Sequence, residues 1–185
     1  MKHTLLFALF FTTLTHAASA SAQERAPHVQ VGVGFQLGVA GSVDDDFGLD
    51  PSFGFQVQGH HPLGRFLLLG GALAYRSMKV EDLDDRFGLF TVGVSVGAHY
   101  AIDLGSMQLD PYALFNIGLG VAGSSGDFDS ETGIDFGLKV GANLWVTDLI
   151  APYLALGYQQ TTVFPEPENL GYGQLIIELG AAARF

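Results

Sequence analysis

The sequence of 185 residues contains no cysteine, few charged residues and, after its N-terminus, no long apolar run. Without cysteine the chain can form neither a disulfide framework nor a thiolate metal site. Hydrophobic residues nevertheless make up 48% of the chain, although no later segment approaches the roughly 18 apolar residues of a membrane helix. A β-sheet wall in which every second residue is apolar reconciles these observations, because its apolar residues need not be contiguous.

Basic residues are scarce as well. The chain has 8 Lys and Arg against 19 Asp and Glu, and its formal net charge is −11. Contacts to the phosphates of DNA or RNA are made mainly by Lys and Arg, so this balance argues against nucleic acid as a partner.

The first 22 residues have the organisation of a secretory signal peptide. Lys2 supplies a positive charge, residues 5–14 form an apolar segment of about the right length, and residues 20–22, Ala-Ser-Ala, fit a small-residue cleavage site. We therefore expect residues 1–22 to be removed on export, which leaves residues 23–185 as one domain. An uncleaved membrane anchor is the alternative, and the shortness of the apolar segment argues against it.

Alternation of apolar with small or polar residues, at a period of two, runs through nearly all of the remaining chain. In the first such segment Val31, Val33 and Phe35 alternate with glycine and glutamine, which places the apolar side chains on one face of a strand. The same pattern predicts eight strands, over residues 29–39, 53–58, 66–76, 89–100, 111–122, 134–146, 152–160 and 172–185.

The connections between these segments alternate between short and long. Three short connections contain the turn formers Pro, Gly and Asp and lie near residues 61–65, 102–108 and 147–151. Four long polar connections carry 13 of the 19 acidic residues and lie near residues 41–52, 77–88, 123–133 and 161–171. Short turns at one end and long loops at the other predict an all-β fold, an eight-stranded antiparallel up-and-down transmembrane β-barrel.

The face opposite the apolar one carries glycine, glutamine and a few charges, among them Lys139 and Glu178. Eight strands leave an interior just wide enough to be filled by side chains. Lys139 precedes Val146 by seven residues and Glu178 precedes Phe185 by seven, which predicts a similar depth in the lumen. Because a single buried charge is costly, we expect Lys139 and Glu178 to pair and to plug the lumen. The alternative is that each charge is hydrated separately.

Residues 172–185 resemble the final strand of bacterial outer-membrane proteins, in which alternating outward residues lead to a C-terminal phenylalanine, here Phe185. With Pro111 and Tyr112 opening the fifth segment, the mature chain resembles the family of small eight-stranded outer-membrane β-barrels, such as the OmpA transmembrane domain and OmpX. The resemblance implies outer-membrane lipids as the surroundings and Phe185 as an assembly signal for the barrel-assembly machinery. Since the chain stops at Phe185, we expect no periplasmic peptidoglycan-binding domain.

Two short motifs are weak matches in a glycine-rich chain. Residues 93–97 match the nucleophile elbow G-x-S-x-G, but an elbow needs a strand-to-helix turn and Ser95 lies inside an alternating segment. Residues 118–123 match G-x-G-x-x-G, but a loop rather than a helix follows them. We therefore predict neither a catalytic residue nor a cofactor site.

No metal site is predicted either. Asp127, Asp129 and Glu131 have the spacing of the first three calcium ligands of an EF-hand, but the glycine at the sixth position and the glutamate at the twelfth are missing. His60 and His61 are predicted in a turn, with no third ligand nearby. Loose divalent binding remains an alternative to a solvated acidic rim.

These features leave several functions open. The function we favour is that of a non-enzymatic barrel with a polar-filled lumen, which has a structural role or binds an extracellular ligand through its acidic loops. A narrow small-solute pore and a lipid-modifying enzyme are alternatives. The positions of His28, His60, His61 and His99 near the turn end argue against an active site at the outer rim. A soluble lipocalin-like carrier would need the reverse polarity.

Overall fold

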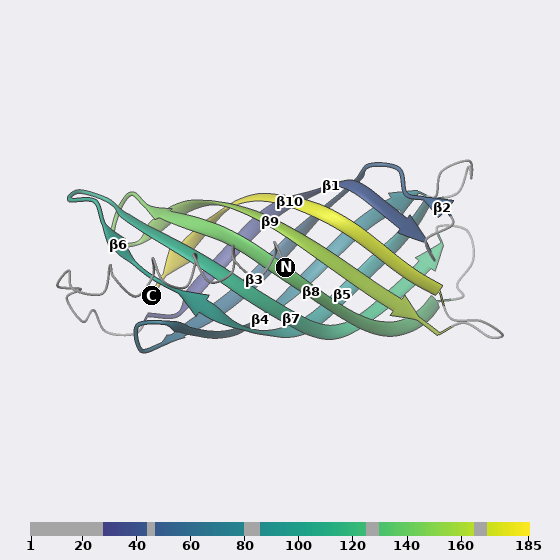
Figure 1. Cartoon of the computed structure of the whole chain (residues 1–185), viewed down its shortest axis with the longest axis horizontal. Coiled ribbons are helices and arrows are strands. Elements are labelled where there is room, and N and C mark those ends of the chain that lie inside the picture. The colour runs from purple at the N-terminus through teal and green to yellow at the C-terminus, as the bar shows by residue number, and fades with distance from the viewer. Residues whose placement is uncertain (1–27, 44–46, 80–85, 125–129, 165–169) are drawn as a thin grey trace, which may run out of the picture.

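In the computed structural model one antiparallel sheet closes into a barrel (Figure 1). The structure describes residues 28–43, 47–79, 86–124, 130–164 and 170–185. The wall consists of β1 (Gln30–Val43), β3 (Ser52–Leu63), β4 (Leu67–Lys79), β5 (Arg86–His99), β7 (Gln108–Ser124), β8 (Ser130–Trp145), β9 (Ile150–Val163) and β10 (Leu170–Arg184). Two short strands, β2 (Phe47–Gly48) and β6 (Ile102–Asp103), pair with the ends of β1 and β7. The expected signal peptide, residues 1–22, lies outside the described residues.

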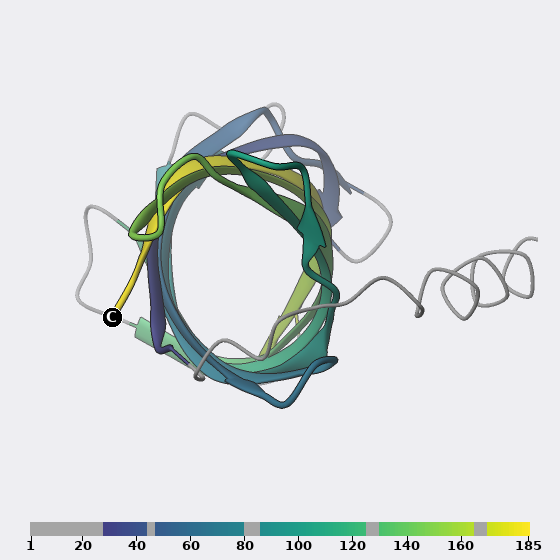
Figure 2. The same ribbon diagram turned by 90° about the vertical axis from the view of Figure 1, so that its left-hand side faces the viewer.

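Long strands adjacent in the sequence are adjacent in the barrel, and β1 pairs with β10 to close it (Figure 2). The predicted eight-stranded up-and-down barrel is therefore confirmed. Most strands extend beyond the predicted ranges because the ladders continue past the alternating cores. His60 and His61 consequently lie in β3, and the prediction that they form a turn is wrong, since this strand stays paired with β4 as far as Leu63 opposite Leu67.

The outward face of the wall is apolar. Along β1, Val31, Val33 and Phe35 are between 38% and 57% exposed, whereas Gln36 is 1% exposed. This arrangement fits lipid as the surroundings, because an Arg or Lys on the lipid side would cost about 2–4 kcal/mol near the bilayer midplane. No helix long and apolar enough to cross a membrane occurs among the described residues.

Aromatic side chains mark both rims of the wall. At the loop end the ring centroids of Phe55 and Tyr75 are 5.8 Å apart, and at the turn end Phe66 stacks on Tyr100 at 5.9 Å. Tyr75 lies across Gly88, where an added Cβ would approach the phenol oxygen at 3.0 Å. Glycine in the neighbouring strand therefore gives this ring the room to lie flat on the wall.

Candidate functional site

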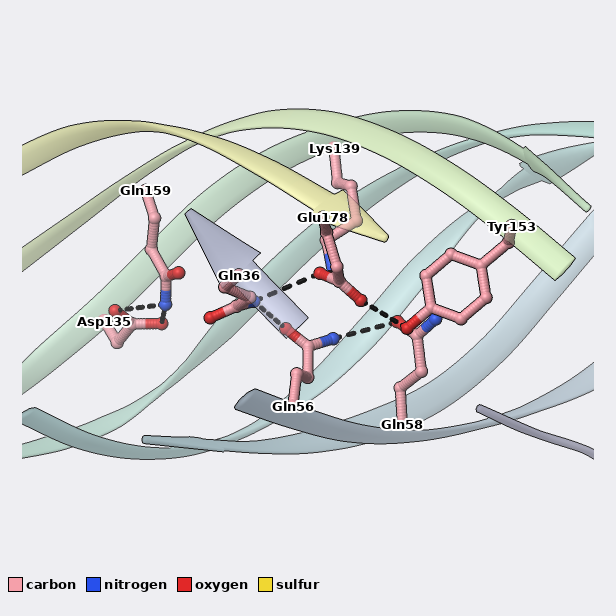
Figure 3. Close-up of polar contacts among 8 residues, drawn as sticks. All are labelled: Gln36, Gln56, Gln58, Asp135, Lys139, Tyr153, Gln159 and Glu178. Atoms are coloured by element: carbon pink, nitrogen blue, oxygen red, sulfur yellow. Dashed lines mark hydrogen bonds and ion pairs between the residues drawn. The ribbon is translucent and has the colours of Figure 1, made fainter. Parts of the chain in front are cut away.

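The centre of the lumen is filled by polar side chains from five neighbouring strands. They form the central polar cluster, which consists of Gln36 (β1), Gln56 and Gln58 (β3), Lys139 (β8), Tyr153 (β9) and Glu178 (β10). All six are at most 9% exposed. Their side chains converge on Glu178 and Gln36 in the middle of the barrel (Figure 3).

The carboxylate of Glu178 accepts three hydrogen bonds. Lys139 Nζ lies 2.6 Å and Gln36 Nε2 3.1 Å from Glu178 Oε2, while Tyr153 Oη donates to Oε1 at 2.6 Å. A carboxylate that is 1% exposed has lost its water and needs such donors to remain charged. One cation and two neutral donors therefore replace the hydration of Glu178.

The hydrogen bonds continue from this carboxylate around the barrel. Gln36 Nε2 also donates to Gln56 Oε1 at 2.6 Å, and Gln56 Nε2 donates to Gln58 Oε1 at 2.9 Å. Because Gln36 belongs to the first strand and Glu178 to the last, the cluster crosses the seam at which the barrel closes.

The structure brings Lys139 and Glu178 together, and the strand register explains how. Lys139 lies opposite Gly157 of the intervening strand β9, and Gly157 lies opposite Ile176 of β10. Glu178 is thus two residues away from the level of Lys139, and its own partner in β9 is Ala155. Glycine and alanine in β9 leave space for the lysine side chain to reach across.

Tyr153 was not singled out from the sequence, although it occupies an inward position of β9. Its ring lies over Gly34 and Gly180, which face each other across the seam. An added Cβ at Gly34 would collide with Tyr153 Oη, and one at Gly180 would collide with the ring. The signal available in the sequence was one large inward residue opposite a glycine-rich face.

A second polar group lies nearer the loop end. Asp135 accepts two hydrogen bonds from Gln159 Nε2, at 2.7 and 2.8 Å, and one from Thr161 Oγ1 at 2.6 Å. Ser52 Oγ donates to Gln174 Oε1 at 2.6 Å. The inward carboxylate of Asp135 is therefore satisfied by neutral donors from the neighbouring strand β9.

Two small cavities lie on either side of the central polar cluster. The one towards the loop end has about 40 Å³ and is lined by Gln36, Asp135 and Lys139, among others. The one towards the turn end has about 10 Å³ and is lined by Gln58 and His60, among others. These volumes hold a few water molecules and one water molecule, respectively.

An apolar group closes the lumen at the loop end, which the sequence did not predict. Its buried members are Val43, Leu49, Met78, Leu89, Ala122 and Val163. A bulge between Gly38 and Ala40 changes the alternation of β1, so that Val43 faces inward although Val31 and Val33 face outward. The interior therefore changes from polar to apolar near the loops.

At the turn end, His99 Nδ1 lies 2.9 Å from Asp110 Oδ1. Asp110 is 3% exposed and belongs to β7, although it lies just before the fifth strand predicted from the sequence, residues 111–122. β7 begins earlier than predicted because its ladder with β8 extends to Gln108 opposite Trp145. This pair is an addition to the predicted interior charges.

The remaining candidate residues lie apart from these groups. Ser95 lies within the continuous strand β5, without the turn to a helix that a nucleophile elbow needs. Phe185 is 72% exposed at the turn-end rim, where its backbone N–H donates to Val29 O at 3.0 Å. Asp127 and Asp129 lie outside the described residues, within which no group of three or more His, Asp or Glu could hold a metal ion.

Comparison with known proteins gives a family and a fold. A family model described as "Outer membrane protein beta-barrel domain" matches residues 8–185. No curated protein matches the sequence.

Three similar solved structures are bacterial surface or outer-membrane proteins. Neisserial surface protein A is 20% identical with a TM-score of 0.56, and the match covers 86% of this chain and 97% of that one. Ail of Yersinia pestis is 14% identical with a TM-score of 0.51, over 87% and 100% of the two chains. OprG of Pseudomonas aeruginosa is 9% identical with a TM-score of 0.58, over 87% and 97%. At these identities the likeness concerns the fold alone.

The ion pair predicts a measurable effect on stability. Lys139→Met should lower the free energy of unfolding by about 3–5 kcal/mol, because it leaves the buried carboxylate of Glu178 without its cation. Lys139→Met/Glu178→Met should cost less than the sum of the two single substitutions, since neither charge then stays unpaired. Urea unfolding in detergent micelles, followed by Trp145 fluorescence, measures both, with the exposed Arg65→Met as control. Single-variant losses within the ~0.5 kcal/mol of ordinary surface substitutions would contradict the expectation.

Proposed function

The chain belongs to the outer membrane protein β-barrel family, and on this premise we propose that it is a closed barrel whose acidic loops make contacts at the cell surface. The wall holds the protein in the outer membrane. The lumen serves as a rigid filled core, and the loops carry the partner contact. Loops held on a rigid scaffold commonly carry function in this way.

The observation that carries the closed lumen is the position of Glu178 with its three donors. An ion that crossed the barrel would have to pass Lys139 and Tyr153, both hydrogen-bonded to this carboxylate. The cavities on either side hold only a few water molecules. These features favour a plug over a narrow small-solute pore.

We propose no enzymatic role. The His99–Asp110 pair has the appearance of a base and its orienting acid, but a nucleophile within hydrogen-bonding distance of His99 is missing among the described residues. The pair also lies at the turn end, away from the outer leaflet. A structural role in the lumen accounts for it.

The charge of the loops indicates the kind of partner. The four long connections defined from the sequence contain 13 acidic residues and two basic ones, Lys79 and Arg86. Ail of Yersinia pestis has been solved in complex with the heparin analogue sucrose octasulfate. For this chain, the excess of acidic residues in the loops favours a cationic surface or divalent cations as the partner that the loops contact.

Export and insertion complete the proposal. Residues 1–22 act as a cleaved signal peptide, and the strand that ends at Phe185 is read by the barrel-assembly machinery. The exposure of Phe185 supports this role, because a side chain that is 72% exposed at the rim is accessible to a partner.

A conductance measurement tests the closed lumen. The purified protein in a planar bilayer should show no steady conductance, because the central polar cluster and the apolar group at the loop end both fill the lumen. Arg65→Ala, in a turn outside the lumen, should behave like the unaltered protein. A steady ion-selective conductance of the unaltered protein would refute the plug.

Protease treatment of whole cells tests the orientation of the loops. A protease that cuts at acidic residues should cleave near residues 44–50 or 81–85 in intact cells, because these loops face outside. Asp103 of β6 and Asp148 of the β8–β9 turn, both exposed at the opposite end, should be cut only after the cells are opened. The reverse order of cleavage would invert the topology.

Deletion of Phe185 tests the assembly signal. The truncated protein should be exported with its signal peptide removed but should accumulate in the periplasm or be degraded there. The measurement is the amount of heat-modifiable barrel in the outer-membrane fraction, with the internal Phe66→Ala as control. An unchanged amount after the deletion would eliminate the proposed role.

A further inference from the structure

Two cations face outward at the loop end of the barrel, directly opposite each other. Lys79, the last residue of β4, is paired in register with Arg86, the first residue of β5. The alternation of both strands directs these side chains away from the lumen, since the inward Met78 and Leu89 are 1% exposed. The guanidinium carbon of Arg86 lies 5.8 Å from the centre of the Phe53 ring on the outer wall.

This pairing is unusual for the chain. Like charges directly opposite each other on neighbouring strands destabilise the pair. Of the other described cations, Arg76 and Lys139 are buried in the lumen, and Arg65 and Arg184 lie at the turn end. Within the described ranges, the cationic side chains of the outward loop-end rim thus meet at one register position, and no carboxylate in those ranges forms an ion pair with them.

Hydroxyl groups lie beside the cations. Tyr75 and Ser77 precede Lys79 on the same outward face of β4, and Ser77 lies opposite Gly88 of β5. The phenol oxygen of Tyr75 extends over that glycine, where an added Cβ would approach it at 3.0 Å. One guanidinium, one ammonium and two hydroxyl donors therefore lie close together on the loop side of the aromatic rim.

We propose that Lys79 and Arg86, with the hydroxyls of Tyr75 and Ser77, bind a phosphate of a phosphorylated lipid headgroup in the outer leaflet. Arginine matches phosphate oxygens with two parallel N–H donors, and lysine adds a mobile point charge. A dianionic phosphate between the two cations attracts both of them and offsets their mutual repulsion.

The surroundings favour a lipid over free phosphate. Phe53, Phe55 and Tyr75, on the membrane side of the cations, are between 40% and 56% exposed on the outer wall. They offer an apolar surface to acyl chains on the membrane side of the phosphate site. Aromatic rings in outer-membrane barrels commonly border the hydrocarbon at this level. The site lies on the outside of the wall, so it does not depend on whether the lumen is closed.

Lipid binding by the purified full-length barrel in phosphatidylcholine nanodiscs tests the proposal. Diphosphoryl lipid A is the probe, and native mass spectrometry measures the lipid retained per barrel across a titration. We expect Lys79→Gln/Arg86→Gln to bind the probe roughly 30-fold more weakly, because each cation near an anionic surface contributes about fivefold. Arg65→Gln, an exposed arginine at the other end of the β3–β4 hairpin, should bind like the unaltered protein.

Further arms separate the alternatives. Lys79→Arg/Arg86→Lys keeps both charges and should retain binding, which distinguishes loss of charge from loss of folding. Inorganic phosphate should not displace the lipid at matched concentration, and displacement would show a free-phosphate site and overturn the lipid assignment. Equal losses in Arg65→Gln and the double variant would show a general electrostatic effect and overturn the proposal, as would unchanged binding in the double variant.

Discussion

The structure depends on one constraint, the pairing of its first and last strands. Inside a bilayer every backbone N–H and C=O needs a partner within the protein, so the sheet must close on itself. β1 and β10 meet this requirement from Gln30 opposite Arg184 to Val43 opposite Tyr172, interrupted only by the bulge near Gly38. Eight strands closed in this way leave a lumen that side chains must fill.

The filling of the lumen follows from its width. Charges that enter so narrow a space lose their water, and Glu178 recovers the loss through Lys139, Tyr153 and Gln36. Because these donors come from both sides of the seam, the carboxylate reaches its full set of partners only in the closed barrel. Closure of the backbone and satisfaction of the buried charge are thus linked in one region of the structure.

The sequence predicted the wall better than the interior. A period of two is a local property of each strand, so the outward set such as Val31, Val33 and Phe35 could be recognised without knowing any neighbour. Lys139 and Glu178 could be placed near each other because equal distances from two strand ends approximate depth. Tyr153 and Asp110 were missed, since their partners depend on the register between strands and on the rotamers of large side chains. The inward orientation of Val43 was missed because a β-bulge does not change the alternating pattern of the residues that precede it.

The packing of Tyr153 over Gly34 and Gly180 also limits which substitutions related sequences can carry at these positions. Neither glycine can gain a side chain while the tyrosine ring occupies the space above the seam. A smaller residue at position 153 has to come first, and it removes one donor from Glu178 at the same time. Related sequences should therefore exchange Gly34 and Tyr153 together, whereas Gly180 should stay glycine because an added Cβ would also collide with the backbone oxygen of Val33.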